Sequence, residues 1–232
     1  MGSKRGRQLV LGLVGQVCAG KSAVADAFRR RGADVFSADA AVHALYMRPA
    51  VIRQVRKLFG AKVLDSSGNV DRRTLGQVVF ASPEKLKLLT AQVVFPRTRE
   101  AVAAALKRFR NSNAPALVLD APTLFEAGDE GLCDGIIFVK APLKKRLAWA
   151  KARGWNVDEI QKRDAIMISA SAKRRRVGVI LNNSGTLKDL DQQVEKLFAA
   201  LASGGRGRTG KKSSPPWGEG RKKKTGAEHA VR

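Results

Sequence analysis

The residues with the most specific chemical pattern are Gly15, Gly20, Lys21 and Ser22, which fit the spacing G-x-x-x-x-G-K-[ST]. In this pattern successive backbone amides form a nest for an anion, and the glycines let the main chain approach phosphate oxygens closely. The lysine bridges the terminal phosphates of a nucleotide, and the serine hydroxyl coordinates Mg²⁺. The spacing predicts a magnesium nucleotide site formed by Gly15, Gln16, Val17, Cys18, Ala19, Gly20, Lys21, Ser22 and Ala23.

This loop lies where the pattern requires it, between a strand and a helix. Residues 8–14 are a short apolar run that predicts a buried strand, and residues 21–31 place apolar side chains on one helical face. A second stretch, residues 205–212, has nearly the same spacing, but Lys212 stands where Ser or Thr belongs and no apolar strand precedes it. We therefore expect phosphate binding at the first stretch and not at the second.

The rest of the chain alternates between apolar runs and helical patterns. Further strands are expected over residues 33–36, 115–120, 135–139 and 179–181, and helical patterns occupy much of 39–110, 143–153, 157–168 and 187–201. Short apolar strands alternating with helices are typical of a parallel sheet covered on both faces. The predicted class is α/β, a three-layer P-loop NTPase fold with a parallel sheet, a helical substrate-binding insertion over about 40–110 and a lid over about 143–170.

The charge of the chain is unusual. Lys and Arg number 44 against 20 Asp and Glu, which gives a formal net charge of +24 and favours anionic ligands. Residues 203–232 are basic and contain Val231 as their only aliphatic side chain larger than alanine. Such a segment cannot bury enough apolar surface to order itself, so we predict a folded body over 8–202 and a disordered tail. Two interpretations of the tail stay open: salt-sensitive binding of nucleic acid, or a solubilising extension.

Composition and missing motifs argue against several classes of protein. Cys18 and Cys133 form no CxxC pair, which argues against a disulfide framework or a zinc site. No apolar run approaches the roughly 20 residues that cross a bilayer, so we expect a cytoplasmic protein without a membrane partner. The base-reading motif of GTPases, Asn-Lys-x-Asp, is absent, and the chain is short for the large ATPases. A small-molecule kinase is the class that remains.

A second candidate for metal binding is Asp120, at the end of the apolar run 115–120. This is the position of the acid that holds Mg²⁺ through water in P-loop proteins. The alternative is a carboxylate that only ends a strand or makes a turn. On the first interpretation, Ser22 and Asp120 are the metal ligands, and Mg²⁺ arrives with ATP as co-substrate.

Together these motifs resemble the dephospho-coenzyme A kinase family, from about residue 9 to residue 197. The resemblance rests on ordered segments that include GLVGQVCAGKS, VFSAD, FGAKVLDSSGNVDRRTLGQVVFASP, FPRTR, LVLDAPTLFEAG, KKRLAWAKARGW, NNSG and QQVEKL. It implies ATP-dependent phosphorylation of the ribose 3′-hydroxyl of dephospho-CoA, which gives coenzyme A and ADP in the last step of coenzyme A biosynthesis.

The family's catalytic base, an aspartate just after the second strand, falls on Asp39. This position suits the role because the carboxyl ends of parallel strands face the ligand. A carboxylate there can accept the hydroxyl proton during attack. The alternative is that Asp39 caps the following helix, and the two roles are compatible.

Arginines in the lid and in the insertion are implied to bind phosphate and substrate. Arg146 and Arg153 are seven apart on one expected helix and would stabilise the transferring phosphoryl group together with Lys21, and Arg163 is a weaker third candidate. A solvated basic face is the alternative. Asn183 and Gly185 match the loop that packs against adenine, or form a plain turn. The implied substrate-binding residues are Asp39, Phe95, Arg97, Arg99, Asp120 and Glu126.

Several positions depart from the family pattern. A histidine is replaced by Phe95, a glutamine by Met167, and acids by Gly178 and Asn182. These departures keep open a related kinase that acts on another nucleoside or a phosphorylated metabolite. The charge keeps open a nucleic-acid-binding protein with a vestigial nucleotide site. The expected partners are ATP and dephospho-CoA, nucleic acid is expected only through the tail, and the chain is expected to be a monomer.

Overall fold

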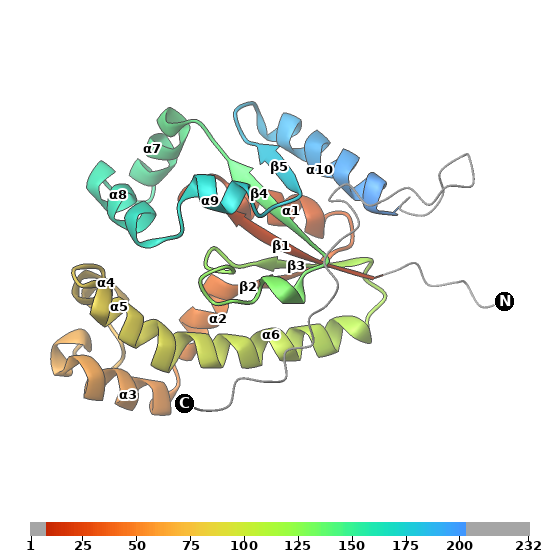
Figure 1. The fold of residues 1–232 in the computed structure, drawn as a ribbon. Coiled ribbons are helices and arrows are strands. Elements are labelled where there is room, and N and C mark those ends of the chain that lie inside the picture. The colour runs from red at the N-terminus through yellow and green to blue at the C-terminus, as the bar shows by residue number, and fades with distance from the viewer. Residues whose placement is uncertain (1–7, 203–232) are drawn as a thin grey trace, which may run out of the picture.

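The computed structural model describes residues 8–202 of the 232-residue chain. Five parallel strands in this range form one sheet in the order β2-β3-β1-β4-β5 (Figure 1). The predicted α/β class and parallel sheet are therefore confirmed. The strands are β1 (Leu9–Gly15), β2 (Asp34–Ser37), β3 (Ala116–Asp120), β4 (Gly135–Lys140) and β5 (Val179–Asn182).

Helices cover both faces of the sheet, which explains why the strands read as continuous apolar runs. On one face, α1 (Lys21–Arg29) and α10 (Leu187–Ala202) bury Phe28 and Val194 against Leu11 of β1. On the other, α6 (Phe95–Arg110) packs against β3, and α9 (Ala170–Arg174) lies beside β1 and β4. The result is three layers with the core between them.

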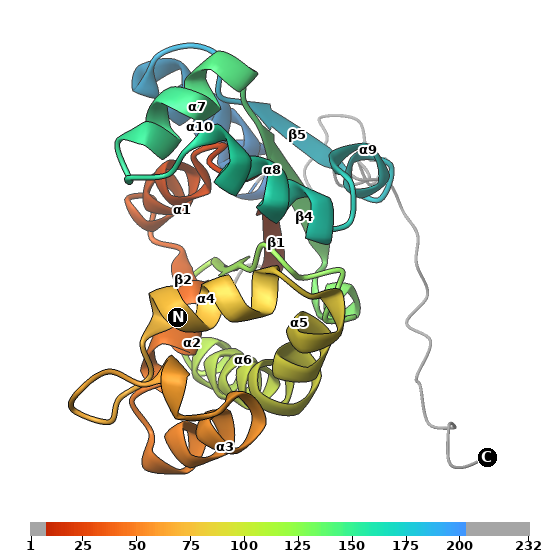
Figure 2. The ribbon, with the colours of Figure 1, turned by 90° about the vertical axis from the view of Figure 1, so that its left-hand side faces the viewer.

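Two groups of helices extend past the sheet, one beyond β2 and one beyond the ends of β4 and β5 (Figures 1 and 2). The first group has a hydrophobic core of its own, which includes Val51, Val55 and Val93. It consists of α2 (Ala38–Leu45), α3 (Pro49–Phe59), η1 (Ala61–Val63), α4 (Arg72–Phe80), α5 (Pro83–Leu89), the π-helical turn η2 (Thr90–Val94) and α6. The second group is α7 (Leu143–Lys151) and α8 (Val157–Ile166).

Residues 83–110 are not one regular helix, because α5 ends at Leu89 and α6 begins at Phe95, directly before Pro96. Because proline lacks an amide hydrogen, it cannot donate within a helix interior. The chain meets this constraint with the π-helical turn η2 directly before α6, and the Thr98 hydroxyl donates to the Val94 carbonyl at 2.9 Å. A short helix that the sequence patterns did not predict, η3 (Glu130–Leu132), follows β3 before β4 begins.

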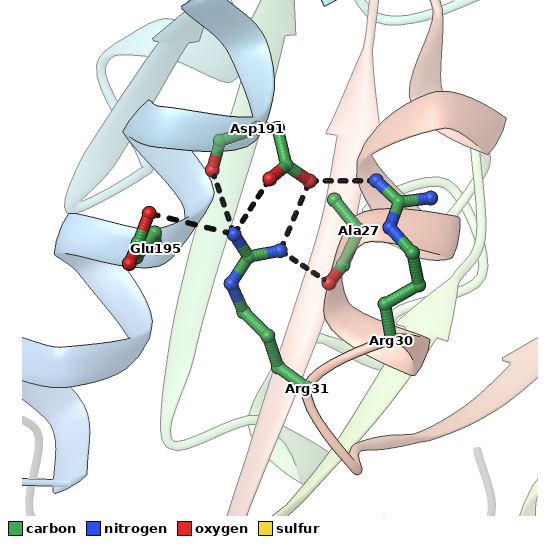
Figure 3. Close-up of polar contacts among 5 residues, drawn as sticks. All are labelled: Ala27, Arg30, Arg31, Asp191 and Glu195. Carbon is green, nitrogen blue, oxygen red and sulfur yellow. Dashed lines mark hydrogen bonds and ion pairs between the residues drawn. The ribbon is translucent and has the colours of Figure 1, made fainter. Parts of the chain in front are cut away.

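Charged side chains fix the end of α1 against α10 (Figure 3). Arg31 donates to both carboxylate oxygens of Asp191, at 2.7 and 3.0 Å, and also to the Ala27 carbonyl, while Arg30 reaches Asp191 at 2.6 Å. Hydrogen bonds from Arg31 and then Arg30 hold the pKa of Asp191 well below its usual range. Because α1 begins at Lys21, these contacts anchor the helix that carries the phosphate-loop lysine.

The sequence also predicts that no segment crosses a membrane and that residues 203–232 form a tail. Among residues 8–202, no helix combines the length and the apolar character needed to cross a membrane. The tail, residues 203–232, lies outside the described residues, as does the second glycine-rich stretch at 205–212.

Candidate active site

The phosphate loop leaves β1 at Gly15 and enters α1 at Lys21. A side chain at Gly15 would meet the Val139 carbonyl oxygen at 2.5 Å, so only glycine fits this close approach to β4. Gly20 has a φ of 88°, and Cys18 has a φ of 57° although it is not glycine. Left-handed residues on either side of Ala19 curl the backbone, and alternation of right- and left-handed residues is the conformation of an anion nest.

The amides of the loop are available for a ligand. Within residues 8–202, the N–H groups of Val17, Cys18 and Gly20 donate to no acceptor, whereas the Gln16 and Ala19 amides close the curl through bonds to Val139 and Gln16 carbonyls. Backbone donors are rarely left without an acceptor when buried. Inward-facing donors at the positive end of α1 therefore suit a phosphate group.

Side chains from distant parts of the chain hold the loop from outside. The Arg146 guanidinium donates to the Val17 carbonyl at 2.7 Å, and the Asn183 amide donates to the Ala19 carbonyl at 3.0 Å. Both side chains are buried. Cys18 is also buried, and it packs against Ala150 of α7 and Ile160 of α8. Helices α7 and α8 and the turn after β5 thus hold the loop in shape.

Lys21 and Ser22 begin α1 and have different surroundings. Ser22 is exposed and its hydroxyl makes no hydrogen bond to the described residues. Burial lowers the pKa of the Lys21 ammonium, while Asp120 and Asp39 oppose this shift and Lys173 adds to it. Lys21 therefore lies within electrostatic reach of two acids and one other cation.

Asp120 ends β3 at the predicted place. Its Oδ1 atom is buried and has no hydrogen-bond partner among the described residues. Burial raises the pKa of this carboxyl to about 6, Lys21 opposes the shift, and Asp39 adds to it. A buried carboxylate oxygen without a donor is costly unless a cation or water completes it. Asp120 is consequently suited to a metal-bound water.

Asp39 lies beside Asp120 because β2 and β3 are neighbours. Ser37 is paired with Asp120 in the sheet register, and Asp39 follows in the first turn of α2. The Ser37 hydroxyl accepts from the Ala40 amide at 3.2 Å and caps this helix. The capping alternative for Asp39 is therefore wrong. Its exposed carboxylate is left free to face a ligand.

A cleft joins Asp39 to the helical group and to the segment after β3. Its walls come from α2, from the η2–α6 junction and from residues 119–129. Thr98 lines it from α6, and Asp129 lines it from the opposite wall. The cleft provides an enclosed place next to the Asp39 carboxylate.

The predicted substrate arginines of α6 both have protein partners. Arg97 donates to the Gln54 side chain at 2.8 Å and to carbonyls of η2, so it links α6 to α3. Arg99 donates to the Asp129 carboxylate at 3.1 Å and to the Ala127 carbonyl. Phe95 is the first residue of α6 and is half-buried. Of these, Arg99 stands at the cleft through its contact with Asp129.

The prediction that Arg146 and Arg153 share one helix face is wrong. Helix α7 ends at Lys151, so Arg153 lies in the following turn and is exposed, whereas Arg146 is buried. Besides the Val17 carbonyl, Arg146 holds Asp164 of α8 at 2.5 Å. A glycine at position 154, with a φ of 73°, permits the turn that ended the helix early.

Arg163 of α8 joins the lid helices to the helical group below them. Its guanidinium lies 4.2 Å from the Trp155 ring centre and 4.7 Å from that of Phe80 in α4. Glu159 accepts from it one helical turn away, at 2.8 Å. This stacking is a contact between the two groups of helices.

Asn183 and Gly185, which were predicted to pack against adenine, lie in the turn after β5. Asn183 is used to hold the phosphate loop, and the Gly185 carbonyl accepts from Lys145 of α7 at 2.5 Å. Trp149 of α7 approaches the same region, since a side chain at Gly20 would come within 4.0 Å of its ring. The turn and α7 therefore lie against each other beside the loop.

One residue of this region was missed by sequence reasoning. Lys173 of α9 is 2% exposed, pairs with Glu126 at 2.9 Å and donates to the Pro122 carbonyl at 2.8 Å. Three further basic residues, 174–176, follow Lys173 in the sequence. Such a run is typical of a solvated surface, so the sequence did not indicate that Lys173 is buried. Helix α9 itself was not predicted.

These groups can perform one kind of chemistry together. A nest of amides and Lys21 would hold a polyphosphate, and Asp39 and Asp120 both lie within electrostatic reach of Lys21. Ser22 and Asp120 offer the hydroxyl and carboxylate oxygens that Mg²⁺ accepts alongside waters and phosphates. The buried, unpartnered Oδ1 of Asp120 fits such an ion. No cluster of three or more His, Cys, Asp or Glu occurs in residues 8–202, so an all-protein cage is not formed there.

Comparison with known proteins gives a consistent result. Residues 9–189 match the family model described as Dephospho-CoA kinase. The chain is 35% identical over 211 residues to a dephospho-CoA kinase of Thermus thermophilus, covering 90% of this chain and all of that protein. It is 37% identical over 192 residues to that of Deinococcus radiodurans, covering 82% and 91%.

Solved structures agree in fold. A crystal structure of a protein from Thermus thermophilus superposes with a TM-score of 0.70 at 34% identity, over 84% of this chain and 98% of that one. A dephospho-CoA kinase from Campylobacter jejuni superposes with a TM-score of 0.57 at 19% identity, over 85% and 99%.

Proposed function

This chain belongs to the dephospho-CoA kinase family, and we propose that it transfers the terminal phosphoryl group of ATP to the ribose 3′-hydroxyl of dephospho-CoA. The products are coenzyme A and ADP. The observation that carries the proposal is the loop of residues 15–20, with unpaired amides at Val17, Cys18 and Gly20, beside two neighbouring acids, Asp39 and Asp120. This arrangement supplies a phosphate cradle, a site for the metal and a base in one place.

The transfer exchanges one bond to phosphorus for another. The 3′-oxygen bonds to the γ-phosphorus, the bond from that phosphorus to the β,γ-bridging oxygen breaks, and the electron pair leaves with ADP. The hydroxyl proton passes to the Asp39 carboxylate, which is exposed and free to accept it. Such proton acceptance contributes about 10²–10⁴-fold in rate.

Charge on the transferring group is balanced by cations of this chain. Lys21 lies at the base of the nest, and Arg153 lies exposed in the turn after α7. Arg146 acts differently from Arg153, because its guanidinium already holds the Val17 carbonyl. We therefore propose that Arg146 shapes the loop and that Arg153 contacts phosphate.

Mg²⁺ would be held by Ser22 and Asp120 with the nucleotide phosphates, and when bound it neutralises phosphate charge. The hydroxyl of Ser22 is exposed, and Asp120 Oδ1 has no other partner in the described residues. Ionised Asp120 binds a cation better than the protonated form does. Because the pKa of Asp120 is about 6 without the ion, metal affinity should rise as pH increases through that value.

The helical groups divide the remaining tasks. We assign substrate binding to α2–α6 with Phe95, Arg97 and Arg99, and closure over the nucleotide to α7 and α8. Gly185 and Asn183 are assigned to the adenine side. Closing these helices would exclude water, which suppresses hydrolysis of ATP. We further propose that the protein acts as a monomer in the cytoplasm.

A coupled assay for ADP release tests the function. With Mg-ATP we expect turnover that depends on dephospho-CoA, and phosphorus NMR should show the new phosphate on the ribose 3′-position. A nucleoside monophosphate serves as the matched acceptor. Turnover on that acceptor but not on dephospho-CoA would overturn the proposed substrate, and salt-sensitive RNA binding without any turnover would overturn the kinase assignment.

A further inference from the structure

A buried ammonium group lies beside the active site without a role in the chemistry described so far. Lys173 is buried, with 2% of its surface exposed. Taking an ammonium out of water costs several kcal/mol unless it is paired. Lys173 has two such partners: its Nζ lies 2.9 Å from Glu126 Oε1 and 2.8 Å from the Pro122 carbonyl oxygen.

The partner carboxylate joins a third segment to this pair. Glu126 Oε1 also accepts from the Ile168 amide at 2.9 Å. Ile168 lies between α8 and α9, where the chain returns from the lid helices to the sheet. One carboxylate oxygen therefore connects the segment after β3, the return from the lid and helix α9.

This junction lies directly next to Asp120. Pro122 is two residues beyond Asp120, and the Ala121 amide between them donates to Leu13 of β1 at 3.3 Å. Strand β1 and Lys173 thus hold the two consecutive residues that follow Asp120. The charge of Lys173 also acts on Lys21 of the phosphate loop.

We propose that Lys173 is a positioning residue for phosphoryl transfer, which with Glu126 fixes the segment after Asp120 against the return from the lid. The Asp120 carboxylate then faces the phosphate loop, and the lid helices close at a set position. The proposal rests on the proposed kinase function, which supplies its activity readout. It also changes the role of Glu126 from a substrate ligand to the partner of Lys173.

If the Lys173–Glu126 pair only stabilised the fold, an apolar pair that restores stability should also restore activity. Replacing a buried ion pair with apolar side chains of similar volume often leaves stability unchanged or raises it, whereas removing one partner is strongly destabilising. An apolar pair could therefore fill this space. It could not hold the Pro122 carbonyl and the Ile168 amide in their directions, because those two groups need a donor and an acceptor.

The test compares Lys173→Met, the double variant Lys173→Met/Glu126→Met, and Lys173→Arg in the full chain, with Arg174→Met as the control. Arg174 is exposed on the same helix and has no ion pair with the described residues. We expect Lys173→Met to lose stability and activity, and the double variant to regain stability. In the double variant kcat should stay at least about tenfold low, which corresponds to 1.4 kcal/mol. Lys173→Arg should recover part of kcat, and the control should match the wild type.

A second readout does not depend on turnover. Calorimetry with a non-hydrolysable ATP analogue should show that the double variant needs several-fold more Mg²⁺ for the same nucleotide affinity. Full recovery of kcat together with stability, or an unchanged Mg²⁺ requirement, would overturn the positioning role. An inactive wild type would instead refute the proposed function, and the Mg²⁺ titration would still decide the role of Lys173.

Discussion

Charged groups at the carboxyl edge of β1, β2 and β3 differ from those in the lid and insertion helices. At the edge, the amides of Val17, Cys18 and Gly20, the Ser22 hydroxyl and Asp120 Oδ1 have no partner within residues 8–202. In the helices, Arg97 and Arg146 are bound to carbonyls and side chains of the protein. The first region is prepared for a ligand, and the second mainly holds that preparation in place.

Polar side chains that bind a ligand and polar side chains that stabilise the fold cannot be told apart by residue type in the sequence. A free polar group in a shaped site is stabilised when a ligand arrives, so its removal should affect turnover more than folding. A buried, engaged arginine contributes to the folded state, because its loss leaves carbonyls and acids without donors. Variants in the two regions should therefore change different quantities.

The largest effect is expected for Lys21→Ala. Removing the cation at the base of the nest should lower kcat by about 10³–10⁵-fold, the range known for cations that stabilise a transferring phosphoryl group. Because burial already penalises the Lys21 charge, the variant should fold at least as stably as the wild type. Steady-state kinetics and urea unfolding measure both. A large loss of stability would show instead that Lys21, like Arg146, mainly supports the folded state.

Asp39→Asn should lower kcat by about 10²–10⁴-fold, because the amide cannot accept the hydroxyl proton. The loop is untouched, so calorimetry should show ATP affinity within a few-fold of the wild type. Ala40→Asn, one position along α2 and also exposed, is the control and should stay near wild-type activity. Near-normal turnover by Asp39→Asn would remove Asp39 from the role of base.

Arg146→Met and Arg153→Met remove a buried and an exposed arginine from the same region. Arg146→Met should lower the free energy of unfolding by about 2–4 kcal/mol, because Asp164 and the Val17 carbonyl lose a buried donor. Arg153→Met should change stability by less than about 0.5 kcal/mol, as exposed substitutions do, and should mainly reduce kcat. Equal stabilities for the two variants would contradict the assignment of Arg146 to the loop.

Titration of Asp120 should make the free energy of unfolding depend on pH. Its pKa of about 6 is above the ordinary value of 3.8, so the folded state binds the proton more tightly and loses stability as pH rises from about 4 to 6. Asp120→Asn lacks this loss and should gain on the order of 1–3 kcal/mol relative to the wild type between pH 4 and pH 7. Chemical unfolding at several pH values measures the difference between the two proteins. A difference that stays constant over this range would refute the shifted titration.

The smallest effect is expected at Cys18, where two terms oppose each other. Its φ of 57° costs about 1 kcal/mol for a residue with a side chain, and glycine would remove that cost. Glycine would also lose the packing against Ala150 and Ile160. Cys18→Gly should therefore lie within about 1 kcal/mol of the wild type, and Cys18→Ala, which keeps the backbone cost, should be less stable than Cys18→Gly. The reverse order of the two variants would rule out backbone strain.

The sequence predicts the edge better than the helices for a physical reason. The phosphate loop depends on local glycine spacing, and Asp39 and Asp120 follow apolar strands whose ends must meet. The partners of Arg146 and Lys173 come from segments that local patterns cannot pair. The Val17–Arg146 bond spans 129 positions, and the Lys173–Pro122 bond spans 51. Short helices such as α9 are hidden as well, because five residues carry too little periodicity.

A crystal structure of the wild-type chain with Mg²⁺, a non-hydrolysable ATP analogue and dephospho-CoA would test directly where the triphosphate and the acceptor hydroxyl bind. We predict that the triphosphate lies in the curl of residues 15–22, with the ribose 3′-hydroxyl within hydrogen-bonding distance of the Asp39 carboxylate. A triphosphate bound elsewhere, or a 3′-hydroxyl that faces a different acid, would contradict the account.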